Sequence, residues 1–401
     1  MLNPKTKQRE LTYVVNIDRI EPIVGSDNCE AAIVGGWRVM TRKGTFQAGD
    51  KAVYFEIDSK VPETETFEFL ASKHYKVKTQ KYTFGGKGLM ISQGLLMSFD
   101  DFGWDNDKYE IGDFLTETLG VKYSIADDNK RKATVNKYAR MKQRNAKLFE
   151  KYKILRTLYN RTWGKKLLFV FLGSRRDARA SFWPDWVVKT DEERVQNLPQ
   201  LFPPDDTTWF VTEKIDGTST TFTMKRGSRN KVEYYVCSRN VCFDKADKQC
   251  YYETNVYTEM AEKYNMEQVL QDILDKNKDL QFVTIQGETY GKGIQQRDYH
   301  MDYVDFKAFN LIFGYKDGTT KRLNPREMTE ILTNTYNIPC IPILDEHFKL
   351  PNSIDEMVAY ADGNSVIDGD YREGVVLRTV DGVNSFKAVS NYYLTSKYGN
   401  N

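Results

Sequence analysis

The chain has 401 residues, is 40% hydrophobic and 13% aromatic, and carries a formal net charge of +2. This composition is typical of a folded globular protein and excludes a largely disordered chain. No apolar stretch approaches the roughly 20 residues that a membrane helix requires, and the most apolar run, residues 167–172, has the length of a strand. The first residues lack the apolar core of a signal peptide, so we expect an intracellular, cytoplasmic protein.

Residues 1–125 have the pattern of a small all-β domain. Short β-branched and aromatic runs occur at residues 11–17, 31–34, 37–41, 51–57 and 94–97, and turn signals separate most of them. Several strands at this spacing predict a small barrel, and an OB-like barrel is the commonest one in proteins that bind nucleic acid. Periodicity alone leaves an SH3-like barrel as an alternative.

Positive charge is concentrated in the next region, residues 126–180. Between Lys130 and Lys166 there are fourteen basic residues and one acid, so this segment carries +13 and leaves −11 for the rest of the chain. Apolar side chains at three-, four- and seven-residue steps between residues 127 and 160 predict an amphipathic basic helix in a linker. Such a segment is typical of a surface that binds a phosphate backbone, and the alternative is a solvated helix face. The candidate nucleic-acid contacts are Lys142, Arg144 and Lys151.

Residues 181–401 mix strands and helices. We expect strands at residues 209–214, 282–285, 306–312, 374–378 and 385–389, and a helix at residues 254–276. The first of these strands ends at Lys214, directly before the turn at Asp216-Gly217. The chain is therefore expected to be an α+β protein with a β-barrel, a basic helical linker and a larger mixed domain.

The segment Lys214-Ile215-Asp216-Gly217-Thr218-Ser219 resembles the nucleophile motif of the covalent nucleotidyltransferase superfamily of polynucleotide ligases and mRNA capping enzymes. Further segments similar to that superfamily follow in its order, namely Ser238-Arg239-Asn240, Gly287-Glu288-Thr289-Tyr290-Gly291, Asp305-Phe306-Lys307-Ala308-Phe309, Arg372-Glu373-Gly374-Val375-Val376-Leu377 and Ser385-Phe386-Lys387. The resemblance implies that residues 181–401 form an adenylyltransferase domain of ATP-grasp-like antiparallel sheets with helices.

By this resemblance, each motif supplies a residue to a reaction with ATP, and so does the upstream segment Lys189-Thr190-Asp191-Glu192-Glu193-Arg194, which also resembles a ligase segment. The implied catalytic residues are Lys214, which forms a phosphoramidate with AMP, Asp216 and Lys387. The implied ATP-binding residues are Lys214, Arg194, Arg239, Glu288, Phe309, Glu373 and Lys387, with Phe309 stacking on adenine. The implied ligands of Mg²⁺ or Mn²⁺ are Asp216, Glu288 and Glu373, since hard cations prefer carboxylate oxygens. On periodicity alone, Phe309 is more easily explained as a core residue.

A lysine with an ordinary pKa near 10.4 is almost wholly protonated and cannot attack a phosphate. We therefore expect Lys387, a divalent metal and partial burial to lower the pKa of Lys214. The same positive charges would neutralise the phosphate as negative charge builds there.

Two features resemble one branch of the superfamily, the family-five RNA ligases. They are the segment Phe386-Lys387-Ala388-Val389-Ser390-Asn391 and a β-domain that precedes the catalytic domain. Thr218-Ser219 is typical of RNA ligases in general, because DNA ligases usually carry an arginine at the position of Ser219. Val389 stands where the usual terminal KxK motif has its second lysine. Which residue takes the role of that lysine is therefore open.

This resemblance implies an ATP-dependent RNA ligase, and we separately expect a monomer. It would join 3′-OH and 5′-phosphate RNA ends, at nicks in a duplex, through lysyl-AMP and RNA-adenylate intermediates. The alternatives are an ATP-dependent DNA ligase, a capping-type guanylyltransferase and a non-catalytic RNA-binding protein.

Overall fold

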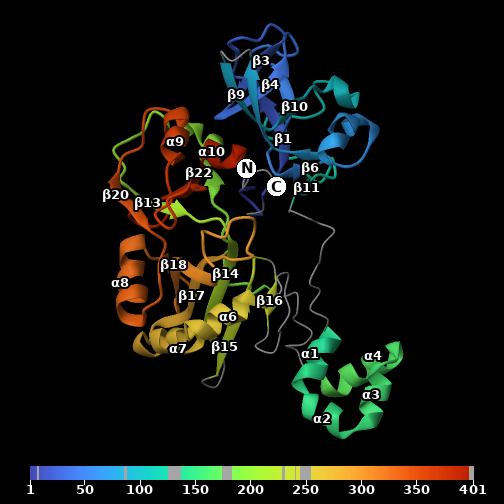
Figure 1. Ribbon diagram of the computed structural model, residues 1–401, viewed down its shortest axis with the longest axis vertical. Helices are drawn as coiled ribbons and strands as arrows, with labels where there is room; N and C mark the ends of the chain where they lie inside the picture. The colour runs from blue at the N-terminus through green and yellow to red at the C-terminus, as the bar shows by residue number, and fades with distance from the viewer. Residues whose placement is uncertain are drawn as a thin grey trace.

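The structure is a computed structural model of the 401-residue chain. It describes all residues except 7–8, 85–87, 125–136, 174–182, 228–230, 240, 244–253 and 397–401. The described residues form an N-terminal group of short strands, a group of short helices and a larger group of sheets and helices (Figure 1). In the part of the chain that the structure describes, no helix is long and apolar enough to cross a membrane.

The N-terminal group consists of short antiparallel strands. One sheet has the order β1-β5-β10 and comprises β1 (Thr12–Asn16), β5 (Lys51–Phe55) and β10 (Leu95–Met97). A second comprises β2 (Arg19–Pro22), β3 (Cys29–Val34) and β4 (Trp37–Arg42). The remaining pairs join β8 (Thr79–Phe84) to β9 (Gly88–Gln93), and β6 (Ser59–Lys60) to both β7 (Lys76–Val77) and β11 (Lys122–Tyr123). Two 3-10 helices, η1 (Glu65–Lys73) and η2 (Asp100–Phe102), complete the group.

The closed barrel expected from the sequence is not formed by the described strands, which pair in four separate sheets. Alternation of inward and outward side chains still builds a core between them, because successive residues of a strand face opposite sides. In β4, Trp37, Val39 and Thr41 are buried. The ring of Trp37 lies 5.6 Å from that of Tyr54, which in turn lies 5.5 Å from the ring of Tyr13.

Residues 137–172 form four short helices, and the single helix expected over residues 127–160 is wrong. The helices are α1 (Lys137–Arg144), α2 (Ala146–Lys151), α3 (Lys153–Tyr159) and α4 (Thr162–Leu172). The breaks fall at Asn145 (φ −103°, ψ 25°) and Tyr152 (φ −115°, ψ 107°), where the backbone leaves the helical region. Residues 127–136 lie outside the described residues. The run 167–172, which has the length of a strand, belongs to α4.

The larger group contains two sheets. A six-stranded antiparallel sheet has the order β16-β15-β14-β17-β18-β19, and a five-stranded sheet has the order β12-β22-β21-β13-β20, in which β12 and β22 are parallel. The strands of the first are β14 (Thr218–Arg226), β15 (Val232–Cys237), β16 (Cys242–Phe243), β17 (Leu280–Gly291), β18 (Val304–Tyr315) and β19 (Thr320–Arg322). Those of the second are β12 (Glu193–Arg194), β13 (Trp209–Lys214), β20 (Ile343–Phe348), β21 (Gly374–Thr379) and β22 (Ser385–Val389).

Helices cover both sheets and bury their apolar faces. The six-stranded sheet packs against α6 (Val256–Lys263), α7 (Met266–Lys276) and α8 (Pro325–Tyr336), and these elements share one core. The five-stranded sheet packs against η3 (Val195–Asn197) and α9 (Ile354–Ala361). Two short helices, η4 (Pro199–Leu201) and α10 (Asn391–Thr395), follow η3 and β22.

The N-terminal group packs directly on the larger group. The backbone N–H of Gly36 donates to the carbonyl oxygen of Gln196 at 2.9 Å, and Trp37 Nε1 donates to Asn197 Oδ1 at 2.7 Å. A Cβ atom at position 36 would come within 2.7 Å of the Gln196 Cα. Only glycine therefore permits this close approach of the two backbones.

Candidate active site

Lys214 lies where the two sheets of the larger group meet. It is the last residue of β13 in the five-stranded sheet, and after three residues the chain enters the six-stranded sheet as β14. Lys214 pairs with Gly374 in the register between β13 and β21, so the residue before Gly374 lies next to the lysine. That residue is Glu373, and its carboxylate Oε1 lies 2.6 Å from Lys214 Nζ.

Glu288 joins this pair from β17. Ser219 pairs with Glu288 in the register between β14 and β17, and Gly217 allows the preceding turn to lie against β17. A Cβ atom at position 217 would come within 2.4 Å of the Thr289 carbonyl oxygen and 2.9 Å of the Glu288 side chain. A larger residue there would push the turn away from Glu288.

Three carboxylates therefore surround one ammonium group. Burial, together with the charge of Glu373, raises the pKa of Asp216 to about 7. Burial also raises the pKa of Glu288 to about 8. The positive charge of Lys214 lowers this pKa, but burial and the negative charges of Glu373 and Asp216 together outweigh it. Burial and mutual repulsion therefore favour the protonated forms of Asp216 and Glu288, because three ionised carboxylates would hold more negative charge than Lys214 alone can balance.

The pKa of Lys214 contradicts the sequence-based expectation. Burial on its own lowers this pKa, but the negative charges of Glu373 and Glu288 outweigh burial and raise it above its ordinary value. We expected neighbouring cations to lower it. For the protein's own side chains that expectation was wrong, because the nearest charges are carboxylates. The effect of a divalent metal stays a prediction.

The chemistry of this cluster fits a divalent cation. Among the described residues no group of three carboxylate, imidazole or thiol side chains is already arranged around a single point as ion ligands are. However, Glu373 Oε2 is buried and has no hydrogen-bond partner. An unpaired carboxylate oxygen beside two further carboxylates matches the oxygen ligands that Mg²⁺ and Mn²⁺ prefer, with water completing the coordination.

Two tyrosines fix Asp216, and the sequence analysis did not identify either. The Tyr393 hydroxyl donates to Asp216 Oδ2, and the backbone N–H of Asp216 donates to the Tyr299 hydroxyl at 2.7 Å. The guanidinium of Arg297 lies 4.1 Å from the ring centroid of Tyr299 and forms a fully buried ion pair with Asp368 at 2.6 Å. These residues follow the motif by long sequence separations, so no local pattern points to them.

A second group of charges lies around Asp191. Lys387 Nζ is 2.8 Å from Asp191 Oδ1, and Arg239 Nη2 is 3.0 Å from Asp191 Oδ2. Burial lowers the pKa of Lys387 to about 8, despite the opposing charge of Asp191. Asp191 itself is buried, which alone would raise its pKa, but Lys387 and further cations hold that pKa well below its usual range. Asp191 was missed because a single acid in an acidic run gives no sequence signal.

Arg194 lies beside Lys387, since the two residues pair in the parallel register of β12 and β22. It is 5% exposed, and its Nη2 lies 3.0 Å from Asp58 Oδ2 of the N-terminal group. Its Nε and Nη1 atoms are buried without a hydrogen-bond partner. Buried, unpaired guanidinium donors are costly unless an anion is bound there.

The remaining candidate residues are divided between the site and the short helices. Phe309 on β18 is half-buried in a cluster with Ile215, which directly follows Lys214. The candidate RNA contacts Lys142, Arg144 and Lys151 lie on α1 and α2, which stand apart from β13 and β14 (Figure 1). The structure thus brings the ATP-site candidates together and keeps the basic helices away from them.

Comparisons with known proteins agree with this arrangement. Residues 207–389 match the family model of RNA ligases, and residues 11–98 match a model of an OB-fold domain. No curated protein sequence matches the chain.

Solved structures of the Naegleria gruberi RNA ligase are similar over nearly the whole chain. A variant with ATP and Mn is 27% identical with a TM-score of 0.71, and the match covers 98% of this chain and 100% of that chain. The same ligase with PPi is 27% identical with a TM-score of 0.68, over 96% and 98% of the two chains. A variant with AMP and Mn is also 27% identical, with a TM-score of 0.67 over 96% and 98%.

The fold and these matches first define a class, an α+β protein with an N-terminal OB-fold domain and a C-terminal nucleotidyltransferase domain. Within that class, the family model places residues 207–389 in the RNA ligase family, and the protein is an ATP-dependent enzyme. The resemblance drawn from the sequence motifs is therefore confirmed.

Proposed function

We propose that the protein joins 3′-OH and 5′-phosphate ends of RNA, at nicks in a duplex, through a lysyl-AMP intermediate on Lys214. The observation that carries this proposal is the juxtaposition of two charge groups. One consists of Lys214 with three carboxylates, and the other consists of Lys387, Arg194 and Arg239 held to carboxylates. Carboxylates suit a divalent cation and the cations suit phosphate oxygens, so both parts of a metal-bound nucleotide find partners.

In the first step, the Nζ lone pair of Lys214 attacks the α-phosphorus of ATP. The bond from the α-phosphorus to the bridging oxygen breaks, and pyrophosphate leaves. Lys214 must first lose a proton, which Glu373 opposes by raising the pKa of Lys214. Asp216, Glu288 and Glu373 would hold Mg²⁺ or Mn²⁺, and the bound cation would supply positive charge that offsets this effect.

The other candidate residues orient the nucleotide. Lys387 contacts the α-phosphate and offsets the charge that builds there, while the unpaired donors of Arg194 bind phosphate oxygens. Arg239 supplies a second guanidinium to the phosphate oxygens once its hydrogen bond to Asp191 is broken. Phe309 stacks on adenine from the apolar cluster beside Ile215.

In the later steps, AMP passes from Lys214 to the RNA 5′-phosphate and forms RNA-adenylate. The 3′-OH oxygen then attacks the 5′-phosphorus, the phosphodiester forms, and AMP leaves. We further propose that residues 1–125, 126–180 and 181–401 are the OB-fold domain, the basic linker and the adenylyltransferase domain. The chain acts as a monomer in this proposal, and Lys142, Arg144 and Lys151 contact the RNA backbone.

The decisive experiment is labelling with α-³²P-ATP or α-³²P-GTP in Mg²⁺ or Mn²⁺, for the wild type and for Lys214→Ala. The expected result is an acid-labile, ATP-specific label that the variant lacks. Absence of label with ATP in either metal would exclude the enzymatic proposal and favour a non-catalytic RNA-binding protein.

Two further outcomes separate the alternative enzymes. A label that forms with GTP alone would indicate a capping-type guanylyltransferase. Sealing of a nick in which both strand ends are DNA, as efficiently as one with an RNA 3′-OH strand, would indicate a DNA ligase.

A further inference from the structure

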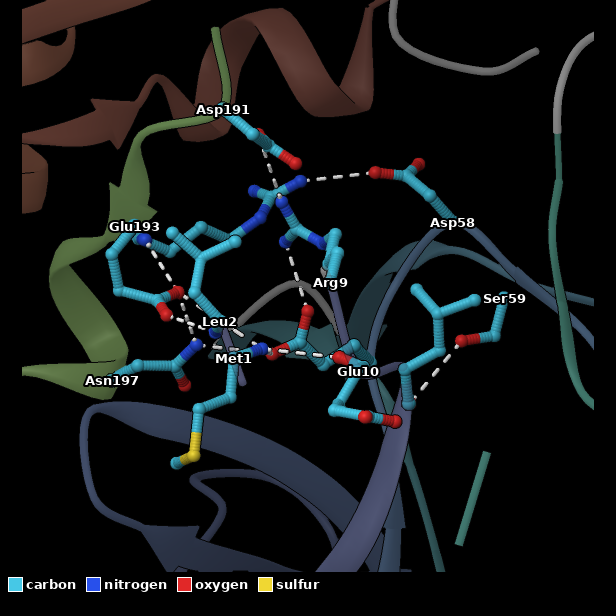
Figure 2. A network of polar contacts seen from close by, with 12 residues as sticks. Met1, Leu2, Arg9, Glu10, Asp58, Ser59, Asp191, Glu193 and Asn197 are labelled. Carbon is cyan, nitrogen blue, oxygen red and sulfur yellow. Dashed lines mark hydrogen bonds and ion pairs between the residues drawn. The ribbon is translucent and has the colours of Figure 1, made fainter. Parts of the chain in front are cut away.

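Arg9 of the OB-fold domain lies between two carboxylates that belong to different domains (Figure 2). Its Nη2 atom is 2.8 Å from Glu56 Oε2 in the same domain, and its Nη1 atom is 3.6 Å from Asp191 Oδ1 in the nucleotidyltransferase domain. The Arg9 side chain is only 8% exposed. It is therefore a buried cation that spans the interface between the two domains.

Glu56 fixes one end of this bridge. Its side chain is fully buried and accepts hydrogen bonds from Asn197 Nδ2 at 3.0 Å and from the Tyr13 hydroxyl at 3.1 Å. Burial alone would raise the pKa of Glu56, but Arg9 and other neighbours hold this pKa at about 2. Glu56 is therefore ionised at neutral pH, and Arg9 has a fixed counter-ion on the side facing the OB fold.

Asp191 connects the other end to the proposed phosphate-binding groups. The same oxygen, Oδ1, that faces Arg9 accepts a hydrogen bond from Lys387 Nζ at 2.8 Å. The Lys387 side chain is 11% exposed and that of Asp191 is 17% exposed. Lys387 is thus connected to the OB-fold domain by two successive ion pairs, from Lys387 to Asp191 and from Asp191 to Arg9.

This connection matters when a phosphate draws Lys387 away from Asp191. Breaking a buried ion pair leaves an uncompensated charge, which is strongly unfavourable. Arg239 also pairs with Asp191, at Oδ2, but in the proposed function it moves to the nucleotide. Without Arg9, Asp191 would then have no cation left and would hold Lys387 back or turn with it. Arg9 keeps a positive charge on Asp191 Oδ1 while Lys387 shares its ammonium with the phosphate.

We propose that Arg9 is a positioning residue for adenylyl transfer, which acts on Lys387 through Asp191. This inference rests on the proposed function, and it assigns to a residue of the OB-fold domain a part in aligning the α-phosphate. Arg9 touches neither the nucleotide nor Lys214 in this proposal. The simpler alternative is that Arg9 only joins the two domains.

The test compares Arg9→Gln, Arg9→Lys and Asp191→Asn with the control Arg19→Gln. Arg19 is an arginine of the same domain that is 57% exposed and pairs with Glu21. The rate of label formation from α-³²P-ATP is measured in a single turnover with Mn²⁺, and melting temperatures are recorded alongside.

Arg9→Gln and Asp191→Asn are expected to slow labelling by about 10- to 100-fold, the range typical of groups that orient a functional residue. Arg9→Lys, which keeps the charge but loses the planar fork, should recover part of the rate. Arg19→Gln should stay within about twofold of the wild type, as expected for a surface position.

The pH dependence of labelling separates positioning from simple stabilisation. The charged groups that face the Lys387 ammonium are Asp191, Arg9, Arg194 and Lys214. Removing the cation Arg9 raises the pKa of Lys387, whereas removing the anion Asp191 lowers it. The pH above which labelling declines should therefore rise in Arg9→Gln and fall in Asp191→Asn.

Three outcomes would overturn the inference. In the first, Arg9→Gln takes up label as fast as Arg19→Gln. In the second, Arg9→Gln and Asp191→Asn keep the wild-type pH profile, and their loss of labelling rate follows their loss of melting temperature. Either result would make Arg9 a structural link and leave the ligase proposal intact. A wild type that takes no label from ATP would remove the proposed function and this inference together.

Discussion

Lys214 Nζ lies 2.6 Å from Glu373 Oε1, so the proposed nucleophile is held as a partly buried ion pair. The pairing raises the pKa of Lys214 and keeps its ammonium protonated in the absence of ligands. A lysine in this state does not attack phosphorus. In the proposed function, the nucleophile therefore depends on a cation that offsets the charge of Glu373.

The first prediction is that Glu373→Gln lowers the pKa of Lys214 and also slows adenylylation. The pKa falls because the carboxylate that raises it is gone. Labelling with α-³²P-ATP should nevertheless slow by about 100-fold, since a proposed metal ligand is also lost. The pKa is measured from the pH dependence of Lys214 acylation, followed by mass spectrometry without metal.

The control for this experiment is Glu259→Gln, which neutralises an exposed carboxylate on α6. It should change neither the pKa of Lys214 nor the labelling rate. Faster labelling in Glu373→Gln than in the wild type would mean that Glu373 only restrains the lysine, and Glu373 would no longer be a candidate metal ligand.

The second prediction is that Glu288→Gln stabilises the metal-free protein at pH 8 but not at pH 4. In the wild type the pKa of Glu288 rises from 4.5 to about 8 on folding, chiefly because the carboxylate is buried. The folded state then keeps a proton that the unfolded state releases, so the free energy of unfolding falls as pH rises between these values. The variant should gain about 1–3 kcal/mol at pH 8 in EDTA.

Denaturant unfolding at both pH values measures this difference. Mn²⁺ should stabilise the wild type and have much less effect on Glu288→Gln, because one proposed ligand is missing. Equal stabilisation of both proteins by Mn²⁺ would exclude Glu288 from the ion's ligands.

Much of the catalytic domain could be predicted from local sequence. The strands expected at residues 209–214 and 385–389 have those same bounds in β13 and β22, because each contains the aromatic and β-branched residues that are typical of strands. The helix expected at 254–276 is interrupted, since Asn265 adopts a left-handed conformation (φ 50°) between α6 and α7. Polar residues such as asparagine tolerate that conformation, but periodicity does not reveal it.

The interactions around the candidate site could be predicted only in part. Motif order identified Lys214 and Glu288, and the structure brings both into one cluster. The order of the motifs did not identify Asp58, which pairs with Arg194 although 136 residues separate the two in sequence. An ion pair between domains leaves no periodic pattern in the sequence. The breaks at Asn145 and Tyr152 were missed for a related reason, since both residues occur within ordinary helices.

The third prediction concerns Arg194, whose Nε and Nη1 atoms are buried without partners. Arg194→Ala should weaken ATP binding by about 10- to 100-fold, because charge-assisted hydrogen bonds to phosphate are lost. Arg194→Lys should restore less than half of that loss on a free-energy scale, since lysine lacks the planar fork. The concentration dependence of labelling on ATP measures the effect.

The matched control is Arg38→Ala, which removes a half-buried arginine of the OB-fold domain that pairs with Glu21. It should leave the ATP dependence unchanged. If Arg194→Ala kept the wild-type ATP dependence, Arg194 would serve the domain interface through Asp58 and not the nucleotide.

The last prediction concerns the basic helices, where two candidate contacts differ in what they do for the fold. Arg144 Nη2 donates to the Leu172 carbonyl oxygen at 2.6 Å and so caps the end of α4. Lys142 lies 4.9 Å from the ring centroid of Tyr159, and Lys151 is exposed on α2. Charge reversal at Arg144 would therefore disturb the helices themselves, so Lys142→Glu combined with Lys151→Glu is the cleaner variant.

This double variant should bind nicked RNA more weakly and with a flatter salt dependence. The slope of the logarithm of affinity against the logarithm of salt concentration should fall by roughly 2, since each phosphate contact contributes about 0.9. Labelling of Lys214 should be unchanged, because α1 and α2 stand apart from β13 (Figure 1). The control for the change in net charge is a second double variant, Lys278→Glu with Lys321→Glu, at lysines that are 74% and 50% exposed. An unchanged salt slope in the double variant would mean that these helices do not contact the RNA backbone.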